Sequence, residues 1–174
     1  MIEFDDSLSV EQPILTFEEQ ASNILRTMLR TALGYASDKP DGVYVYIQID
    51  GEKASMDTLY RINNKFYETN TLNNANIKDF TFNVSIERQT QLLQYFTKDL
   101  TEKLIPLFLQ NKKNLPNEIW TSYDLKTNEQ STTYGYSFDV PLLVTNDALA
   151  EWKEKLISPD PVSNILSKID ADVL

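Results

Sequence analysis

Apolar residues recur at helical spacing near the start of the chain. Phe17 begins a series that continues at positions 21, 24, 28, 32 and 35, and steps of three or four residues are typical of a helix with one buried face. Thr16 and Glu19 form a capping box before it, since each side chain can accept a hydrogen bond from the other residue's backbone N–H. The pattern predicts a first helix from Phe17 to about residues 34–37.

The pattern then changes to the alternation of a half-buried strand. Apolar residues occupy every second position from Val43 to Ile49, which is the period of a strand with one buried face. Asp50-Gly51 is a strong hairpin signal and leads to a return strand over residues 54–62. Asn63-Asn64 favours a second tight turn, followed by a third strand over residues 65–72. These segments predict a three-stranded meander.

A long second helix follows an Asn-rich loop at residues 73–83. Ser85 is a candidate N-cap, and apolar residues then fall at positions 86, 93, 96, 100, 104 and 107. Pro106 lies inside this series. Because proline lacks a backbone N–H and clashes with the preceding turn, we expect it to kink or end the helix.

Residues 116–139 predict a β-hairpin, because both arms are rich in aromatic and β-branched residues and the connection is polar. Placing Leu125 opposite Gln130 separates an apolar face from a polar one, whereas a slip of one residue would mix them. The apolar face carries Ile119, Tyr123, Leu125, Thr132, Tyr134, Tyr136 and Phe138, and the polar face carries Glu118, Trp120, Ser122, Asp124, Ser131, Thr133, Ser137 and Asp139.

Trp120 is the one large aromatic residue on the polar face. The predicted pairing places it opposite Gly135, where a ring can cover the backbone that glycine leaves bare. Two interpretations stay open. Trp120 packs beneath a helix or loop, or it is an aromatic anchor on an acidic surface, a residue type enriched at binding hot spots.

The remaining segments complete an α+β fold. Pro141 breaks the last strand, and short helices are expected over residues 148–157 and 161–169. Residues 1–12 form a loose tail, and residues 13–174 form a single domain. The order α-β-β-β-α-β-β-α has no βαβ unit, so it implies an antiparallel sheet of about five strands, a meander plus a C-terminal hairpin, with helices packed on one face.

The charge restricts the partners. The chain has 26 acidic and 16 basic residues, a formal net charge of −10, which opposes nucleic-acid binding and suits a basic protein partner. Basic residues near the aromatic residues of the meander are few, which argues against a base-stacking surface. The first residues resemble no signal peptide, and no apolar run approaches the roughly 20 residues of a membrane span. We expect a cytoplasmic protein that binds no membrane.

The candidate chemistry is sparse. The chain has no histidine and no cysteine, which removes the commonest general base and the usual zinc ligands. Its four glycines form no phosphate-binding motif. Paired carboxylates fall at a tail, a helix start, a turn and a loop, where solvated charge is the usual role. We therefore expect no catalytic, cofactor-binding or metal site, and a carboxylate hydrolase using Mg²⁺ is the least favoured hypothesis.

Several segments resemble the EsaG/YezG-like family of bacterial antitoxin (immunity) proteins. They are Pro116-x-Glu118-x-Trp120-Thr121-Ser122-x-Asp124 with the return strand ending in Tyr136-x-Phe138, Val43-Tyr44-Val45-Tyr46, Ala54-Ser55-Met56-Asp57-x-Leu59-Tyr60-Arg61-Ile62, Glu87-Arg88-Gln89, and residues 147–152 with their closing Trp152. The resemblance extends from about Phe17 to Lys155, and the helix expected after Pro159 departs from the family pattern.

The resemblance implies a non-enzymatic, cytoplasmic immunity protein. Such a protein binds and neutralises a cognate secreted toxin, often a nuclease exported by a type VII (LXG-type) secretion system. The hypothesis from a different class is a cytoplasmic adaptor or ligand-binding module without a toxin partner. We expect a monomer or weak dimer.

The polar face of the hairpin is the candidate partner surface. Its residues are Glu118, Trp120, Ser122, Asp124 and Asp139. An aromatic anchor ringed by carboxylates suits a basic cleft, because the indole can desolvate the centre while the acids meet Lys or Arg at the rim.

Overall fold

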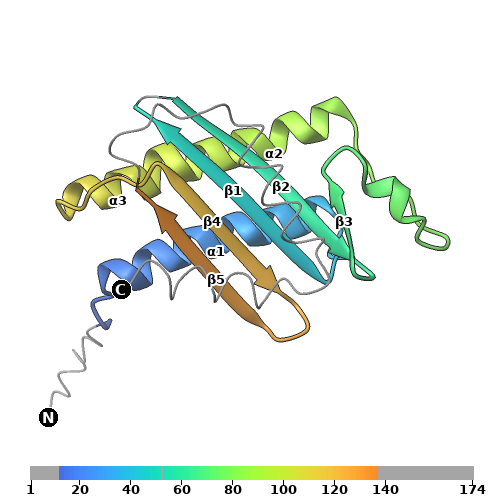
Figure 1. Ribbon diagram of the computed structural model, residues 1–174, viewed down its shortest axis with the longest axis horizontal. Coiled ribbons are helices and arrows are strands. Elements are labelled where there is room, and N and C mark those ends of the chain that lie inside the picture. Colours follow the sequence, from blue (N-terminus) through green and yellow to red (C-terminus); the bar gives the residue numbers. More distant parts are fainter. Residues whose placement is uncertain (1–11, 52, 137–174) are drawn as a thin grey trace, which may run out of the picture.

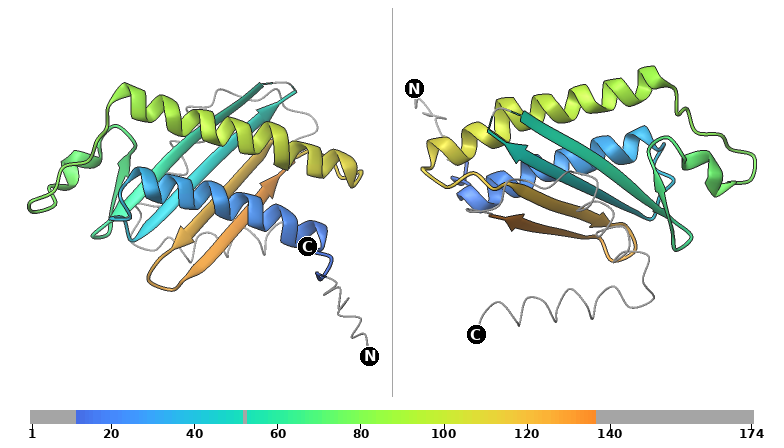
Figure 2. Two further views of the ribbon diagram at one scale, coloured as in Figure 1. Left: turned by 180° about the vertical axis from the view of Figure 1, so that it is seen from behind. Right: turned by 45° about the horizontal axis from the view of Figure 1, so that its top comes forward.

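The computed structural model describes residues 12–51 and 53–136 of the 174-residue chain. These residues form a five-stranded antiparallel sheet in the order β3-β2-β1-β4-β5, with helices against one face (Figures 1 and 2). The expected α+β class and five-stranded antiparallel sheet are confirmed. The tail predicted over residues 1–12 lies outside the described residues except for its last residue, and the helices expected over residues 148–157 and 161–169 lie outside them entirely.

Helix α1 spans Phe17–Tyr35 and starts where the capping box predicts. The Thr16 hydroxyl accepts a hydrogen bond from the Glu19 N–H at 3.2 Å, and the Glu19 carboxylate accepts one from the Thr16 N–H at 2.8 Å. Two of the N–H groups that a helix start leaves without partners are thereby satisfied.

The meander consists of β1 (Gly42–Asp50), β2 (Lys53–Ile62) and β3 (Lys65–Glu68). The prediction that the third strand reaches residue 72 is wrong. After Glu68 the chain turns, with the Thr71 N–H donating to the Glu68 carbonyl at 3.0 Å. A 3₁₀ helix, η1 (Leu72–Ala75), follows and buries Leu72 completely. Burying the Leu72 side chain in the core stabilises a turn here more than further pairing would stabilise a longer edge strand.

The second helical segment is continuous but changes its winding. Helix α2 (Ile86–Asp99) is capped by Ser85, whose hydroxyl accepts from the Arg88 N–H. A π-helical turn, η2 (Leu100–Leu104), leads into α3 (Ile105–Gln110). The Ile105 N–H donates to the Leu100 carbonyl five residues earlier. This turn ends two residues before Pro106, so the predicted disturbance takes the form of a wider turn rather than the end of the helix.

The hairpin forms from β4 (Glu118–Asp124) and β5 (Glu129–Gly135). Asp124 pairs with Glu129, so the predicted pairing of Leu125 with Gln130 is wrong by two residues. The Asp124 carboxylate accepts hydrogen bonds from the N–H groups of Lys126 and Thr127, and this local turn starts the loop directly after Asp124. Because side chains alternate with a period of two, a shift of two leaves the predicted faces unchanged.

The core lies between the helices and one face of the sheet (Figure 2). Helix α1 packs against β1 and β4, and α2 packs against β2. The fully buried core residues include Leu25, Met28, Phe96, Leu100, Phe108, Val45, Ile47 and Ile119. The opposite face of the sheet carries the candidate partner surface.

Candidate functional site

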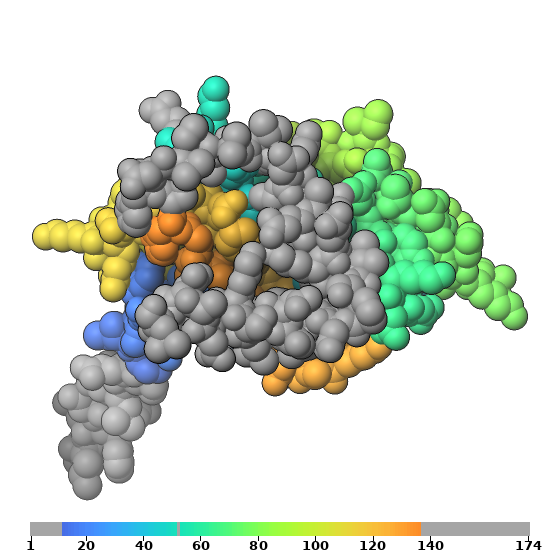
Figure 3. All heavy atoms as spheres, in the orientation of Figure 1, coloured from blue at the N-terminus to red at the C-terminus, as the bar shows by residue number. Residues whose placement is uncertain are grey.

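Four of the five predicted surface residues lie together on the sheet face opposite α1 and α2. They are Glu118, Trp120, Ser122 and Asp124, all on β4 and all half-buried. Atoms of β4 and β5 reach the surface of this face in the space-filling view (Figure 3). The fifth predicted residue, Asp139, lies outside the described residues.

Trp120 is held between two neighbouring strands. Its ring lies 5.5 Å from that of Tyr46 on β1, measured between centroids, with the planes tilted by 33°. A methyl group added at Gly135 would lie 3.0 Å from Cζ3 of the indole. Trp120 pairs with Thr133 rather than Gly135, so the predicted pair is wrong, but the ring still covers this glycine diagonally. Neither α1 nor α2 covers Trp120, since both pack on the other face.

Glu118 contacts Tyr46, the residue whose ring lies beside Trp120. The Tyr46 hydroxyl donates a hydrogen bond to Oε1 of Glu118 at 2.7 Å. Burial, followed by this hydrogen bond and the negative charge of Glu118, raises the pKa of Tyr46. Tyr46 therefore stays a neutral donor, and it fixes the carboxylate beside the indole.

Asp124 belongs to a second cluster, centred on Arg61 at the end of β2. The guanidinium donates from Nη2 to Oδ2 of Asp124 at 2.9 Å, from Nε to Oδ1 of Asp41 at 2.6 Å, and from Nη1 to the Tyr44 hydroxyl at 3.0 Å. Because β1 lies between β2 and β4, Arg61 must cross a whole strand to reach Asp124.

Gly42 makes this crossing possible. It pairs with Arg61 on one side and with Asp124 on the other. A Cβ atom at Gly42 would lie only 3.2 Å from Cζ of Arg61, so a larger residue would press on the guanidinium. Gly42 on β1 therefore lets the Arg61 guanidinium from β2 bind the Asp124 carboxylate from β4.

The cluster keeps Asp124 ionised. Partial burial alone would raise the pKa of Asp124, but the Arg61 guanidinium and the N–H groups of Lys126 and Thr127 outweigh it and hold the pKa below its usual value. Lys126 adds a second cation, with its Nζ 3.3 Å from Oδ2 of Asp41. Asp124 is thus both a surface carboxylate and a link between strands.

The sequence interpretation did not identify Arg61, Asp41 or Gly42 as parts of this surface. The Asp50-Gly51 signal does not specify their pairing. If these two residues formed the loop, Arg61 would lie opposite Pro40, whereas Asp50 pairs with Lys53 and thereby places Arg61 opposite Gly42. Arg61 reaches the carboxylate of Asp124 only because β4 pairs with β1. The local sequence pattern does not specify that pairing.

Two further observations concern residues 12–51 and 53–136. No three Asp or Glu side chains there converge as metal ligands. None of the helices in the same ranges is both long and apolar enough to cross a membrane.

No family model matches this chain, and no curated protein matches it. The resemblance to the EsaG/YezG-like family therefore stays a prediction from sequence motifs.

Proposed function

We propose that this protein is an immunity protein, an antitoxin that binds and neutralises a cognate secreted toxin in the cytoplasm of the producing cell. The contact surface is centred on Trp120, on the sheet face opposite α1 and α2. Glu118, Ser122 and Asp124 flank it on the same strand. The toxin presents a basic cleft to this surface.

The fixed position of Trp120 is the observation that carries the proposal. Tyr46 supports the indole from the next strand, and Gly135 gives it room. A side chain that is already ordered loses little conformational entropy on binding. Half-buried, preorganised tryptophans are the type of residue that contributes most to protein–protein affinity.

The flanking carboxylates fit a cationic partner. Glu118 is held in place by the hydroxyl of Tyr46, and Asp124 by the guanidinium of Arg61 and the N–H groups of Lys126 and Thr127. An ionised carboxylate has about four lone-pair sites, so each keeps capacity for a Lys or Arg of the toxin. The net charge of −10 also attracts a cationic partner, and it does so over a longer range than these two carboxylates.

Two residues from separate motifs contact each other in this fold. Arg61, in the motif on β2, binds Asp124, in the motif on β4, although 63 positions separate them. The presence of both Arg61 and Asp124 in this sequence therefore has a physical reason in this fold. The resemblance further suggests a nuclease exported by a type VII (LXG-type) system as the toxin, and nuclease clefts are basic because they bind phosphates.

Co-expression with the neighbouring reading frame tests the proposal. We expect the wild-type protein to restore growth of cells that express the neighbouring toxin, and purified Trp120→Ala to bind that toxin at least about thirtyfold more weakly, as for a central hot spot. Tyr95→Ala is the matched control, because Tyr95 is an exposed aromatic residue on α2, on the other side of the molecule.

Equal weakening by both variants would contradict the assigned surface. Absence of both rescue and binding by the wild-type protein would contradict the antitoxin function itself. Stable capture of a non-toxic protein through Trp120 would instead favour an adaptor.

A further inference from the structure

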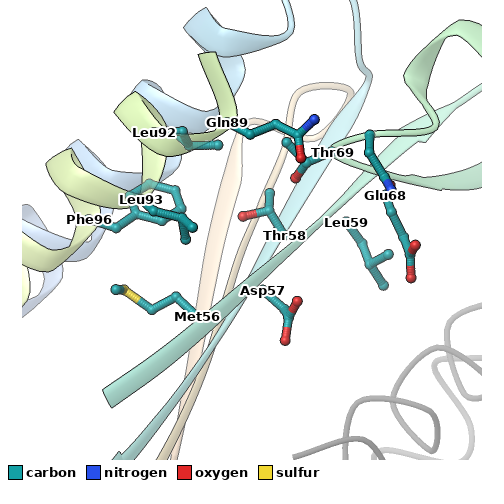
Figure 4. A pocket seen from close by; sticks show the side chains of 11 residues that line it. Met56, Asp57, Thr58, Leu59, Glu68, Thr69, Gln89, Leu92, Leu93 and Phe96 are labelled. Atoms are coloured by element: carbon teal, nitrogen blue, oxygen red, sulfur yellow. The ribbon is translucent and has the colours of Figure 1, made fainter. Parts of the chain in front are cut away.

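Two apolar side chains among the described residues are buried outside the core. Tyr46 on β1 and Leu59 on β2 are 0% and 2% exposed, yet neither belongs to the cluster packed between the helices and the sheet. Both lie on the sheet face opposite the helices. Tyr46 lies beside Trp120 on that face, and Leu59 points away from α2, whereas Thr58 next to it points toward α2 (Figure 4).

This burial indicates that another segment covers the two side chains. Side chains stand roughly perpendicular to a sheet, so their neighbours on the same face enclose their sides but leave their ends open to solvent. The helices that the structure describes contribute their buried residues to the core on the other face. One face of an antiparallel sheet is commonly solvated, and exposures near zero show that this part of the face is not.

The covered area lies over β1, β2 and β3. The ring of Tyr44 on β1 lies 5.4 Å from that of Phe66 on β3, measured between centroids, and Leu59 pairs with Tyr44. We call Tyr44, Tyr46, Leu59 and Phe66 the Leu59 patch. The same face is more open toward the other edge of the sheet, where Ser131 and Thr133 on β5 are exposed.

We propose that residues 137–174 of this chain cover the Leu59 patch. The segment follows directly on Tyr136, next to the end of β5. The sequence predicts two short helices in it, over residues 148–157 and 161–169, and each carries an apolar stripe at helical spacing. The stripes consist of Leu149, Trp152 and Leu156, and of Val162, Ile165 and Ile169. Helices of about ten residues need packing against other elements to be stable in water, and the Leu59 patch provides an apolar surface for it.

The segment is long enough to reach the patch. Strand β2 lies three strand spacings from β5 in the sheet order, which is about 15 Å. Residues 137–147, which precede the first expected helix, can span up to about 35 Å when extended. A segment of the same chain is also at high effective concentration near the patch, because no second molecule has to associate.

Other occupants fit less well. Residues 1–11 precede α1, which packs on the opposite face of the sheet. Another copy of this chain carries the same net charge of −10, so the two copies repel each other. The inference does not depend on the antitoxin role. It leaves Trp120 and the β5 side of the face to a partner, and it limits the proposed contact surface on the β2 side.

Paramagnetic relaxation tests the placement of the segment in the full chain. The protein has no cysteine, so Glu154→Cys carries a single nitroxide, on the side of the expected helix opposite its apolar stripe. We expect the methyl signals of Leu59 to lose intensity and those of Leu93, which is exposed on α2, to keep it. Lys98→Cys is the matched control, because a nitroxide on α2 should give the reverse pattern.

Limited trypsin digestion tests the contact. Leu59→Asp places a charge beneath the proposed cover and should open it. We expect cleavage after Lys153 and Lys155 to accelerate about tenfold or more, while cleavage within residues 53–68 keeps its wild-type rate. Ser131→Asp is the matched control, because it adds the same charge to an exposed position of the same face. Its cleavage rates should change less than about twofold.

Each other outcome contradicts the inference. If the Glu154→Cys nitroxide weakens the signals of Leu93 in place of those of Leu59, the segment lies on the helices. If it weakens neither set, the segment covers neither face. Loss of the Leu59 signals only when the nitroxide is on a different chain from the observed methyl groups identifies a second copy as the cover. Loss of these signals with Ser7→Cys alone identifies the N-terminal residues.

A second variant keeps the digestion test decisive if Leu59→Asp does not fold. Trp152→Ala removes the largest side chain of the first stripe and leaves the described sheet unaltered. We expect it to accelerate cleavage after Lys153 about tenfold or more, because a large buried side chain is lost from the contact. An unchanged rate, or equal acceleration by Leu59→Asp and Ser131→Asp, would mean that the segment does not pack on the Leu59 patch.

Discussion

At the residue scale, two glycines shape the sheet face opposite the helices. Gly42 lies under Arg61 and Gly135 lies under Trp120, with added methyl groups only 3.2 and 3.0 Å from the nearest atoms of those side chains. In each case a long side chain from a neighbouring strand uses the space that a Cβ would fill. Glycine at these two positions thus leaves room for the Arg61 guanidinium and the Trp120 indole.

Asp124→Asn should lower the free energy of unfolding near neutral pH by about 1–2 kcal/mol, because it removes a charge-assisted hydrogen bond to Arg61. The pKa of Asp124 is lower in the folded protein than its usual 3.8. Its stabilisation is therefore complete above that usual value and is lost as pH falls through the lower, folded-state pKa. The difference between wild type and variant, measured by denaturant unfolding, should narrow below about pH 4.

Glu129→Gln provides the matched control for this titration. Glu129 is exposed on β5 directly opposite Asp124, and no contact to Arg61 holds it. It loses the same charge, so we expect its unfolding free energy to stay within about 0.5 kcal/mol of wild type. Equal destabilisation by the two variants would mean that net charge, rather than the Arg61 contact, is responsible.

At the element scale, helix starts follow from local sequence. Thr16→Ala should lower the free energy of unfolding by about 0.5–2 kcal/mol, because it leaves N–H groups of the first turn of α1 without partners. Chemical denaturation measures the effect.

Thr27→Ala makes the same chemical change in the exposed middle of α1, where it should stabilise by a few tenths of a kcal/mol through helix propensity. An unchanged midpoint for Thr16→Ala, or equal shifts for the two variants, would contradict the capping role.

The elements that the sequence predicted correctly have local causes. The caps at Thr16 and Ser85, the presence of a hairpin directly after Asp50 and the faces of β4 all follow from residue types within a few positions. The errors have tertiary or side-chain causes. Strand β3 ends early because Leu72 is drawn into the core, and the hairpin loop starts one residue early because the Asp124 carboxylate binds the next N–H groups.

At the scale of the whole molecule, the sheet joins two units that are distant in sequence. The meander and the hairpin meet where β1 pairs with β4, a contact that no periodicity specifies. This pairing brings Arg61 to Asp124 and Tyr46 to Trp120. The sequence could therefore indicate which residues of β4 share a face, whereas their partners on β1 and β2 required the assembled sheet.

The net charge of −10 acts on the molecule as a whole and governs how it meets a basic partner. Attraction between opposite net charges accelerates encounter, and salt screens it over about 8 Å at physiological ionic strength. We expect the association rate constant with the proposed basic toxin to fall steeply between low and physiological salt, while the dissociation rate constant changes little. Stopped-flow mixing measures both. Trp120→Ala should keep the salt dependence of association and accelerate dissociation, because a hydrophobic anchor acts after encounter. A salt-independent association rate would rule out electrostatic steering by the acidic surface.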